Sequence, residues 1–310
     1  MFSFKEVHGV LPVLHTPFNM LDEIDESILV REVEWVIAQG ADGVATGMVS
    51  ELLRISPSER MRLHEVVCNA GINLGCLIVL STGSESSKQS IEYTKHAESL
   101  GADAVMVNPP FTTALDDDAL YSHYAMILDS TNIPLIVQDA SGYIGKALSL
   151  EIQIKLLNNY GKRVYFKPEA VPIGQRLSTF MALTEGKARV FEGSGGAALV
   201  DTYSRGVVGT MPGADTTWSI VALWNALKRD DLELVNAISG PLANLINLEY
   251  SIDSYIAIEK YLLRKQGIFV NELVREPVGY RLDNKTREHV DRIFQDLFRS
   301  VHKTNFASIA

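Results

Sequence analysis

The chain has 310 residues, of which 46% are hydrophobic and 21% are charged, the composition of an ordinary globular protein. Its formal net charge of −10 argues against binding to nucleic acid or to an anionic membrane surface. The two cysteines, Cys68 and Cys76, are too few for a disulfide framework, and no apolar run approaches the roughly 18 residues that span a bilayer. The first residues also lack the apolar core of a signal peptide. We therefore expect a soluble cytoplasmic protein.

Short apolar segments alternate with longer helical patterns over the first three quarters of the chain. The apolar segments do not alternate with polar residues, which is typical of parallel strands buried on both faces. The strands are expected at 10–15, 43–47, 76–81, 104–108, 134–138, 163–167, 188–192 and 206–210. The helices between them are expected at 25–39, 56–70, 85–100, 116–130, 149–159, 173–184 and 196–203.

Eight strand–helix alternations by about residue 230 predict an α/β protein of the (β/α)8 TIM barrel class, spanning residues 1–230. A doubly wound open sheet is the runner-up, but no strand is followed by a GxGxxG or Walker-type loop. Beyond residue 230 the strand signals stop. Amphipathic helices at 232–250, 252–266 and 286–302 predict a C-terminal three-helix extension over residues 231–310.

A lysine ends the expected sixth strand, in the stretch at 163–169. Side chains on a strand alternate between faces, so Lys167 and Glu169 project to the same side. Active sites of barrels lie at the carboxyl ends of the strands, which places Lys167 at the mouth. Desolvation there would lower the pKa of the amine and favour its attack on a ketone to form an imine. A structural ion pair with Glu169 is the competing interpretation.

The histidines carry no metal-site spacing. The seven of them show neither HxH nor HExxH patterns, so we expect no metal and no cofactor.

The order of these signals resembles the dihydrodipicolinate synthase / N-acetylneuraminate lyase superfamily of class I Schiff-base barrels. The matching segments lie at 9–12, 16–18, 40–43, 47–51, 97–104, 109–110, 134–137 and 166–167. The resemblance implies Lys167 as the imine-forming residue, a small 2-keto acid such as pyruvate as ligand, and a homotetramer.

The departures from the family pattern concern the substrate. The family's Gly-Thr-Thr-Gly-Glu is Gly-Met-Val-Ser-Glu at 47–51, which leaves Ser50 and the backbone N–H groups near it as donors to a carboxylate. The tyrosine that ends the fifth strand in the family is Gln138, and an amide is no general base at neutral pH. Phe111 replaces another tyrosine, and Tyr143 stands where an arginine is expected.

One branch is closer in motif. The segments at 137–140, 165–169, 209–213 and 241–249 resemble the 2-keto-3-deoxy-L-arabonate dehydratases, which form the same imine but expel water. We therefore expect a hydro-lyase that dehydrates a 2-keto-3-deoxy sugar acid, with Lys167 and Glu169 catalytic. Burial would raise the pKa of Glu169 and a neighbouring ammonium would lower it, and the sequence leaves that balance open.

The remaining site residues are expected to bind substrate. They are Met48, Val49, Ser50, Gln138, Ser194 and Thr210. Gln138 is alternatively a plug of the barrel, and Ser194 alternatively part of a glycine-rich turn. Glu51 is expected to be structural. Glu249 and Tyr250 are expected on the surface of an appended helix, away from the mouth unless that helix folds back over it.

Three other functions stay open. The first is a class I aldolase that cleaves the same kind of acid to pyruvate and an aldehyde, with Tyr143 or water as its proton shuttle. The second is a dihydrodipicolinate synthase-like enzyme. The third, from another class, is a barrel that binds a keto acid without turnover.

Overall fold

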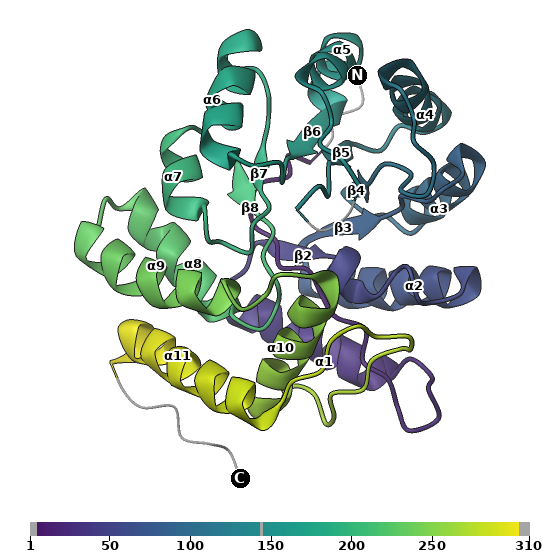
Figure 1. Cartoon of the computed structure of the whole chain (residues 1–310). Coiled ribbons are helices and arrows are strands. Elements are labelled where there is room, and N and C mark those ends of the chain that lie inside the picture. Colours follow the sequence, from purple (N-terminus) through teal and green to yellow (C-terminus); the bar gives the residue numbers. More distant parts are fainter. Residues whose placement is uncertain (1–4, 143–144, 304–310) are drawn as a thin grey trace.

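The computed structural model describes residues 5–142 and 145–303. Strands and helices alternate through this part of the chain, as Figure 1 shows. The strands are β1 (Gly9–Val10), β2 (Gly43–Ala45), β3 (Leu77–Ser81), β4 (Ala104–Val107), β5 (Leu135–Gln138), β6 (Val164–Lys167), β7 (Phe191–Glu192) and β8 (Gly209–Thr210). The helices that follow them are α1 (Glu26–Ala38), α2 (Pro57–Leu74), α3 (Ser87–Ser99), α4 (Asp117–Ser130), α5 (Leu150–Tyr160), α6 (Ile173–Leu183), α7 (Leu199–Ser204) and α8 (Thr217–Lys228).

The strands close into a ring. β2 to β6 form one parallel sheet in sequence order, and β1, β8 and β7 form a second. Parallel bridges between Val13 and Ala45 and between Phe166 and Val190 join the two sheets on both sides. The (β/α)8 barrel is therefore confirmed, and the open doubly wound sheet is wrong.

The first strand and the last two are shorter than the sequence predicted, although their ladder continues beyond the assigned ends. The Leu11 N–H donates to Thr210 O at 2.9 Å and the Val13 N–H to Pro212 O at 2.7 Å. Pro12 lies between these two donors and has no N–H of its own, which interrupts the regular pattern.

Two apolar layers follow from the alternation of side chains. Ile136 and Tyr165 belong to the cluster inside the barrel. Val137 and Phe166, one residue further on, belong to the cluster between the strands and the helices. The next residue on each strand faces inward again, so β5 and β6 direct Gln138 and Lys167 into the barrel. The same two residues are Cα partners in the ladder.

The helix starts follow the local signals. Ser56 and Glu59 form a reciprocal capping box at the start of α2, with Pro57 in the first turn. The helix runs past the expected end at residue 70 and stops at Leu74, because Gly75 adopts the left-handed conformation that terminates helices.

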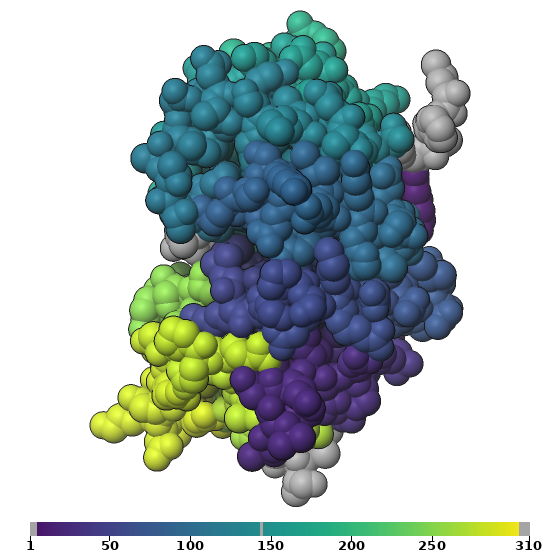
Figure 2. Space-filling model, turned by 90° about the vertical axis from the view of Figure 1, so that its right-hand side faces the viewer, coloured from purple at the N-terminus to yellow at the C-terminus, as the bar shows by residue number. Residues whose placement is uncertain are grey.

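Three further helices complete the molecule: α9 (Leu232–Ile246), α10 (Ile252–Lys265) and α11 (Asn284–His302). Their apolar side chains, among them Ile238, Ile258 and Phe294, belong to the same cluster as the outer face of the barrel. Figure 2 shows the C-terminal segment against the amino-terminal one, and Arg31 of α1 donates to Ile268 O at 3.3 Å. We propose the junction of barrel and extension between residues 230 and 231, where α8 has ended and α9 has not begun.

No helix in the described ranges has the length and apolarity that crossing a membrane requires.

Candidate active site

Lys167 and Glu169 meet at the carboxyl end of β6. Lys167 Nζ lies 2.6 Å from Glu169 Oε1, and the two side chains are only 4% and 3% exposed. Strand alternation predicted that they share a side, and this contact agrees with it. A buried amine and carboxylate at this distance form a charge-assisted pair.

Gln138 completes the group from the neighbouring strand. Its Nε2 donates to Glu169 Oε1 at 2.7 Å, so this one carboxylate oxygen accepts from both Lys167 and Gln138. Gln138 Oε1 and Glu169 Oε2 are buried without a hydrogen-bond partner among the described residues. Buried polar atoms of this kind are normally paired, so these two acceptors mark an incomplete hydrogen-bond network around the carboxylate.

Asp139 holds the backbone of this group in place. Its Oδ1 accepts the Glu169 N–H at 3.0 Å and the Ser141 N–H at 3.1 Å. Ala140 takes a positive φ of 48° between them, a conformation that a non-glycine residue keeps only where the surroundings fix it.

The carboxyl of Glu169 has a raised pKa. Burial is the largest cause, and the negative charge of Asp139 adds to it. Lys167 and Gln138 act in the opposite direction, but desolvation outweighs them. The balance that the sequence left open therefore falls on the side of a more basic carboxylate.

A small cavity of about 30 Å³ opens on Lys167. This is room for at least one water molecule. Its walls come from the ends of the strands and from α10: Val13, Gly47, Met48, Val49, Met106, Gln138, Lys167, Gly193, Gly195, Met211, Pro212, Gly213, Tyr255 and Glu259. A larger cavity of about 1050 Å³ lies at the other end of the barrel, beside Arg163 and Arg189 at the starts of β6 and β7, away from Lys167.

Met48 and Val49 line the cavity, and Ser50 does not. The three form the 3₁₀ turn η1 (Met48–Ser50). The Ser50 hydroxyl accepts the Gly47 N–H at 3.0 Å and donates to Leu14 O. In this arrangement the hydroxyl shapes the turn.

Ser194 and Thr210 also lie outside the cavity lining, because Glu192 engages both hydroxyls. Thr210 Oγ1 donates to Glu192 Oε2 at 2.6 Å, and Ser194 donates its hydroxyl to Oε1. Gly193 between them borders the cavity. A Cβ at Gly193 would lie 3.0 Å from Lys167 Cγ and 3.1 Å from Glu169 Cγ, so only glycine fits without displacing the pair.

Tyr255 and Glu259 are cavity residues that the sequence analysis missed. Both lie on α10, which folds over the mouth of the barrel. Their spacing of four residues on a buried helix face was the available signal. The expectation for Glu249 was wrong: it is only 6% exposed, in the turn before α10. Tyr250 is 71% exposed, as expected, and Tyr143 lies outside the described residues.

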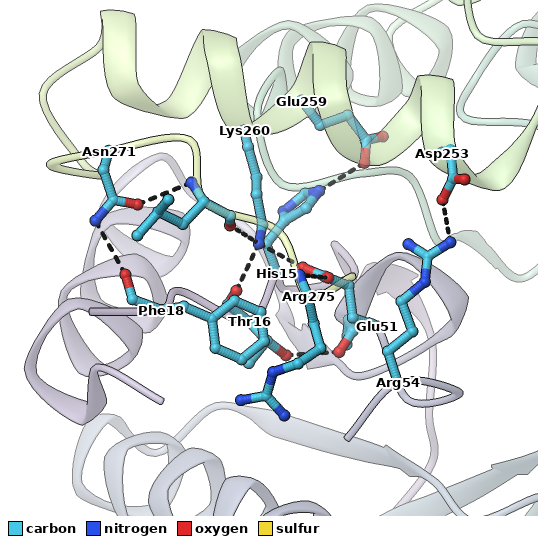
Figure 3. A network of polar contacts seen from close by, with 12 residues as sticks. His15, Thr16, Phe18, Glu51, Arg54, Asp253, Glu259, Lys260, Asn271 and Arg275 are labelled. Carbon is cyan, nitrogen blue, oxygen red and sulfur yellow. Dashed lines mark hydrogen bonds and ion pairs between the residues drawn. The ribbon is translucent and has the colours of Figure 1, made fainter. Parts of the chain in front are cut away.

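Lys260 fixes α10 to the barrel. Its buried Nζ donates to Thr16 O at 2.8 Å and to Leu273 O at 2.7 Å, and it pairs with Glu51, as Figure 3 shows. The other oxygen of Glu51 accepts the Arg275 N–H at 2.8 Å. Glu51 therefore ties three segments together, as the structural interpretation predicted.

His15 makes a second buried link between the barrel and α10 (Figure 3). Its Nε2 lies 2.6 Å from Glu259 Oε2, and its Nδ1 lies 3.2 Å from Glu32 Oε1. Burial lowers the pKa of His15, but the two glutamates outweigh it and raise the pKa to about 10. Burial raises the pKa of Glu32 more than its contacts with His15 lower it. Glu32 also accepts the backbone N–H of His15 on both oxygens.

No set of three or more His, Cys, Asp or Glu side chains within residues 5–142 and 145–303 is arranged to hold a metal ion. The polar groups that line the cavity are an amine, an amide, a phenol and the carboxylate of Glu259, and Glu169 lies behind the amine that it contacts. Such groups form covalent imines and move protons.

The closed ring of parallel strands and the buried lysine on its sixth strand define a class: (β/α)8 barrels with a buried amine at the carboxyl ends of the strands. A model of the dihydrodipicolinate synthetase family matches residues 6–297, so the chain belongs to this family.

Relatives agree with this assignment. The 4-hydroxy-tetrahydrodipicolinate synthase of Bartonella bacilliformis is 31% identical over 153 residues, which are 49% of this chain and only 52% of that protein. An uncharacterized DapA-like lyase of Pyrococcus horikoshii is 27% identical over 90% of this chain and 96% of its own length. The crystal structure of dihydrodipicolinate synthase from Rhodopseudomonas palustris superposes with a TM-score of 0.86 at 20% identity, covering 95% of this chain and all of that one.

Proposed function

We propose that this protein is a Schiff-base-forming lyase that dehydrates a 2-keto-3-deoxy sugar acid, such as 2-keto-3-deoxy-L-arabonate. The observation that carries the proposal is the buried Lys167–Glu169 pair with Gln138 bound to the same carboxylate oxygen. Elimination fits this group better than carbon–carbon cleavage. Lys167 supplies the amine and Glu169 a base of raised pKa, whereas Gln138 stands in place of a tyrosine and cannot relay the proton that cleavage requires.

The chemistry begins with the amine. Lys167 Nζ adds to the C2 carbonyl, water leaves, and an iminium forms. Glu169 removes a proton from C3, whose electrons form a C2=C3 enamine. The C4–O bond then breaks as the C3=C4 bond forms, the departing oxygen takes up a proton and leaves as water, and the iminium is regenerated. Loss of a proton from C5 and gain of one at C3 convert the unsaturated chain to the semialdehyde, and hydrolysis frees this product and the lysine.

The other predicted residues hold the substrate. We propose that the backbone N–H groups of Met48 and Val49, at the open end of the η1 turn, receive the substrate carboxylate. In this proposal Ser50 keeps that turn in shape, and Ser194 and Thr210 act through Glu192 to fix the loops that follow β7 and β8.

Trapping with borohydride tests the imine. We expect pyruvate and borohydride to add one reduced adduct, located on Lys167 by peptide mass spectrometry. The variant Lys167→Arg keeps the charge next to Glu169 but cannot form the imine, and it should give no adduct. The control Lys187→Arg changes an exposed lysine that is 70% accessible and should label like the wild type. If the wild type gives no adduct, the remaining interpretation is a barrel that binds a keto acid without turnover.

Product analysis distinguishes the three candidate activities of this protein. On a panel of 2-keto-3-deoxypentonates, a semialdehyde with an unchanged number of carbons indicates the dehydratase, and pyruvate release indicates the aldolase. Condensation of pyruvate with aspartate semialdehyde would indicate a dihydrodipicolinate synthase-like enzyme. Glu169→Gln should abolish elimination and leave trapping intact, whereas full activity of this variant would contradict the role of Glu169.

Two properties of the whole protein complete the proposal. Family membership supports a homotetramer, which light scattering after size-exclusion chromatography tests. Cys68 and Cys76 are both free thiols, which supports a cytoplasmic location.

A further inference from the structure

Tyr255 is the one phenol on the walls of the small cavity, among the described residues, and it comes from the appended helix α10. The residue is 9% exposed. It lines the same cavity of about 30 Å³ as Lys167 and Gln138. The extension therefore contributes a proton-carrying group to a site that the barrel alone would leave with an amine, a carboxylate and an amide.

Elimination of water needs two proton transfers at different atoms. A base takes the C3 proton, and the C4 oxygen must receive a proton to leave as water and not as hydroxide. The proposed function assigns the first transfer to Glu169. Gln138 offers only amide protons, which are not acidic at neutral pH, so it cannot perform the second.

We propose that Tyr255 is the catalytic acid of the dehydration and gives its hydroxyl proton to the departing C4 oxygen. This inference rests on the proposed function. Its geometric basis is the position of Tyr255 on the wall shared with Lys167, Gln138 and Glu259.

The surroundings of Tyr255 keep its hydroxyl protonated. Burial raises its pKa, and so do the negative charges of Glu249, Glu259, Glu169 and Glu192. The phenol therefore keeps its proton until the C4–O bond breaks, because a departing hydroxide is a stronger base than a phenolate.

Two further buried carboxyls lie in the electrostatic field of Glu259. Burial, with the charges of Glu259 and Asp215, raises the pKa of Glu249. Burial and the charge of Glu259 raise the pKa of Asp215 to about 8. Asp215 and Glu259 also converge in space, since a Cβ at Gly213 would lie 3.0 Å from Asp215 Oδ1 and 2.0 Å from Glu259 Oε1.

The step balances as follows. When the C4–O bond breaks, the departing oxygen takes the Tyr255 hydroxyl proton, and water leaves. Glu169 holds the proton that it took from C3. After product release Glu169 loses this proton to solvent and Tyr255 regains one from solvent, so the enzyme is unchanged and no oxidant or further reactant is consumed.

The test compares Tyr255→Phe with the wild type on two substrates. On the 2-keto-3-deoxypentonate we expect kcat for dehydration to fall about 10²- to 10⁴-fold, the usual effect of losing a general acid. On the analogue with fluorine in place of the C4 hydroxyl, the variant should keep most of the wild-type rate, because fluoride leaves without a proton. Borohydride trapping of pyruvate and exchange of its methyl protons in D₂O should be unchanged.

A matched control lies on the same helix. The Tyr261 hydroxyl donates to Asp291 Oδ1 at 2.7 Å, away from the cavity, and Tyr261→Phe should retain dehydration. Wild-type dehydration by Tyr255→Phe would overturn the inference, and so would an equal loss on both substrates, which would mean that the ring only supports the site. If the wild type itself releases pyruvate and no dehydrated product, the proposed function fails, and the inference fails with it.

Discussion

Asp139 controls the Glu169 carboxyl through both a hydrogen bond and its charge. It accepts the Glu169 N–H, and its negative charge raises the pKa of that carboxyl. In the proposed mechanism Glu169 is the base, so activity should fall as the pH decreases through its raised pKa, above the ordinary value of 4.5.

We predict that Asp139→Asn moves the acid limb of kcat/KM to lower pH. The asparagine keeps an oxygen for the Glu169 N–H and removes the charge, so the pKa of Glu169 decreases. The measurement is kcat/KM between pH 4 and 8 for both enzymes. An acid limb that stays in place or moves to higher pH would contradict the assignment of Glu169 as the base.

Gly193 is the second residue whose role follows from local geometry. We predict that Gly193→Ala slows imine formation about 10-fold, since its methyl group would displace Lys167 and Glu169 by a few tenths of an ångström from their positions. The readout is the rate of borohydride trapping with pyruvate. Gly240→Ala, at an exposed helical position with nothing within 4 Å of the added carbon, should trap normally and gain up to about 1 kcal/mol of stability. Normal trapping by both variants would exclude this role for Gly193.

At the scale of elements, the strands were predictable because their signal is local. Alternation by one residue places Gln138 and Lys167 inside the barrel and Phe166 outside it, and no distant part of the chain changes that. The hydroxyls of Ser194 and Thr210 were expected to face substrate. They bind Glu192 instead, and such a choice among partners depends on how two neighbouring loops meet.

The position of α10 could not be predicted in the same way. Its buried face shows in the sequence, but what it covers depends on contacts with residues more than 200 positions earlier, such as Thr16 and Glu51. Tyr255 and Glu259 therefore escaped the sequence analysis, and Glu249 was misplaced on the surface.

We predict that the Lys260–Glu51 pair stabilises the packing of α10 against the barrel. Lys260→Met and Glu51→Leu should each lower the free energy of unfolding by about 3–5 kcal/mol, because each leaves one buried charge unpaired. The double variant should lose less than the sum of the two. Urea unfolding of the four proteins measures this, with Lys187→Ala as an exposed control that changes little. Additive losses would mean that the pair does not act as a unit.

At the scale of the whole molecule, buried ionisable side chains of the extension contact those of the barrel. His15 of the barrel lies between Glu32 of α1 and Glu259 of α10, and Asp215 after β8 is also in the field of Glu259. The contacts between α10 and the barrel are thus made by groups that gain or lose protons. The free energy of unfolding therefore depends on pH.

The sign of that linkage is the same for His15 and Asp215. Both have a raised pKa in the folded protein, so each contributes stability below its ordinary pKa and loses it as the pH rises through the folded one. For Asp215 the window runs from 3.8 to about 8, and for His15 from 6.5 to about 10.

We predict that His15→Gln destabilises the protein most at pH 6 and least above pH 10. At pH 6 the loss should be about 3–5 kcal/mol, because the variant leaves Glu32 and Glu259 without the cation between them. Between pH 6.5 and 10 the difference from the wild type should shrink, since the wild-type imidazolium loses its proton. Urea unfolding at pH 6, 8 and 10 measures the difference. Asp215→Asn serves as the matched control: its difference in free energy of unfolding from the wild type should change below pH 8 and stay constant above it. A difference for His15→Gln that does not depend on pH would mean that His15 is neutral in the folded protein.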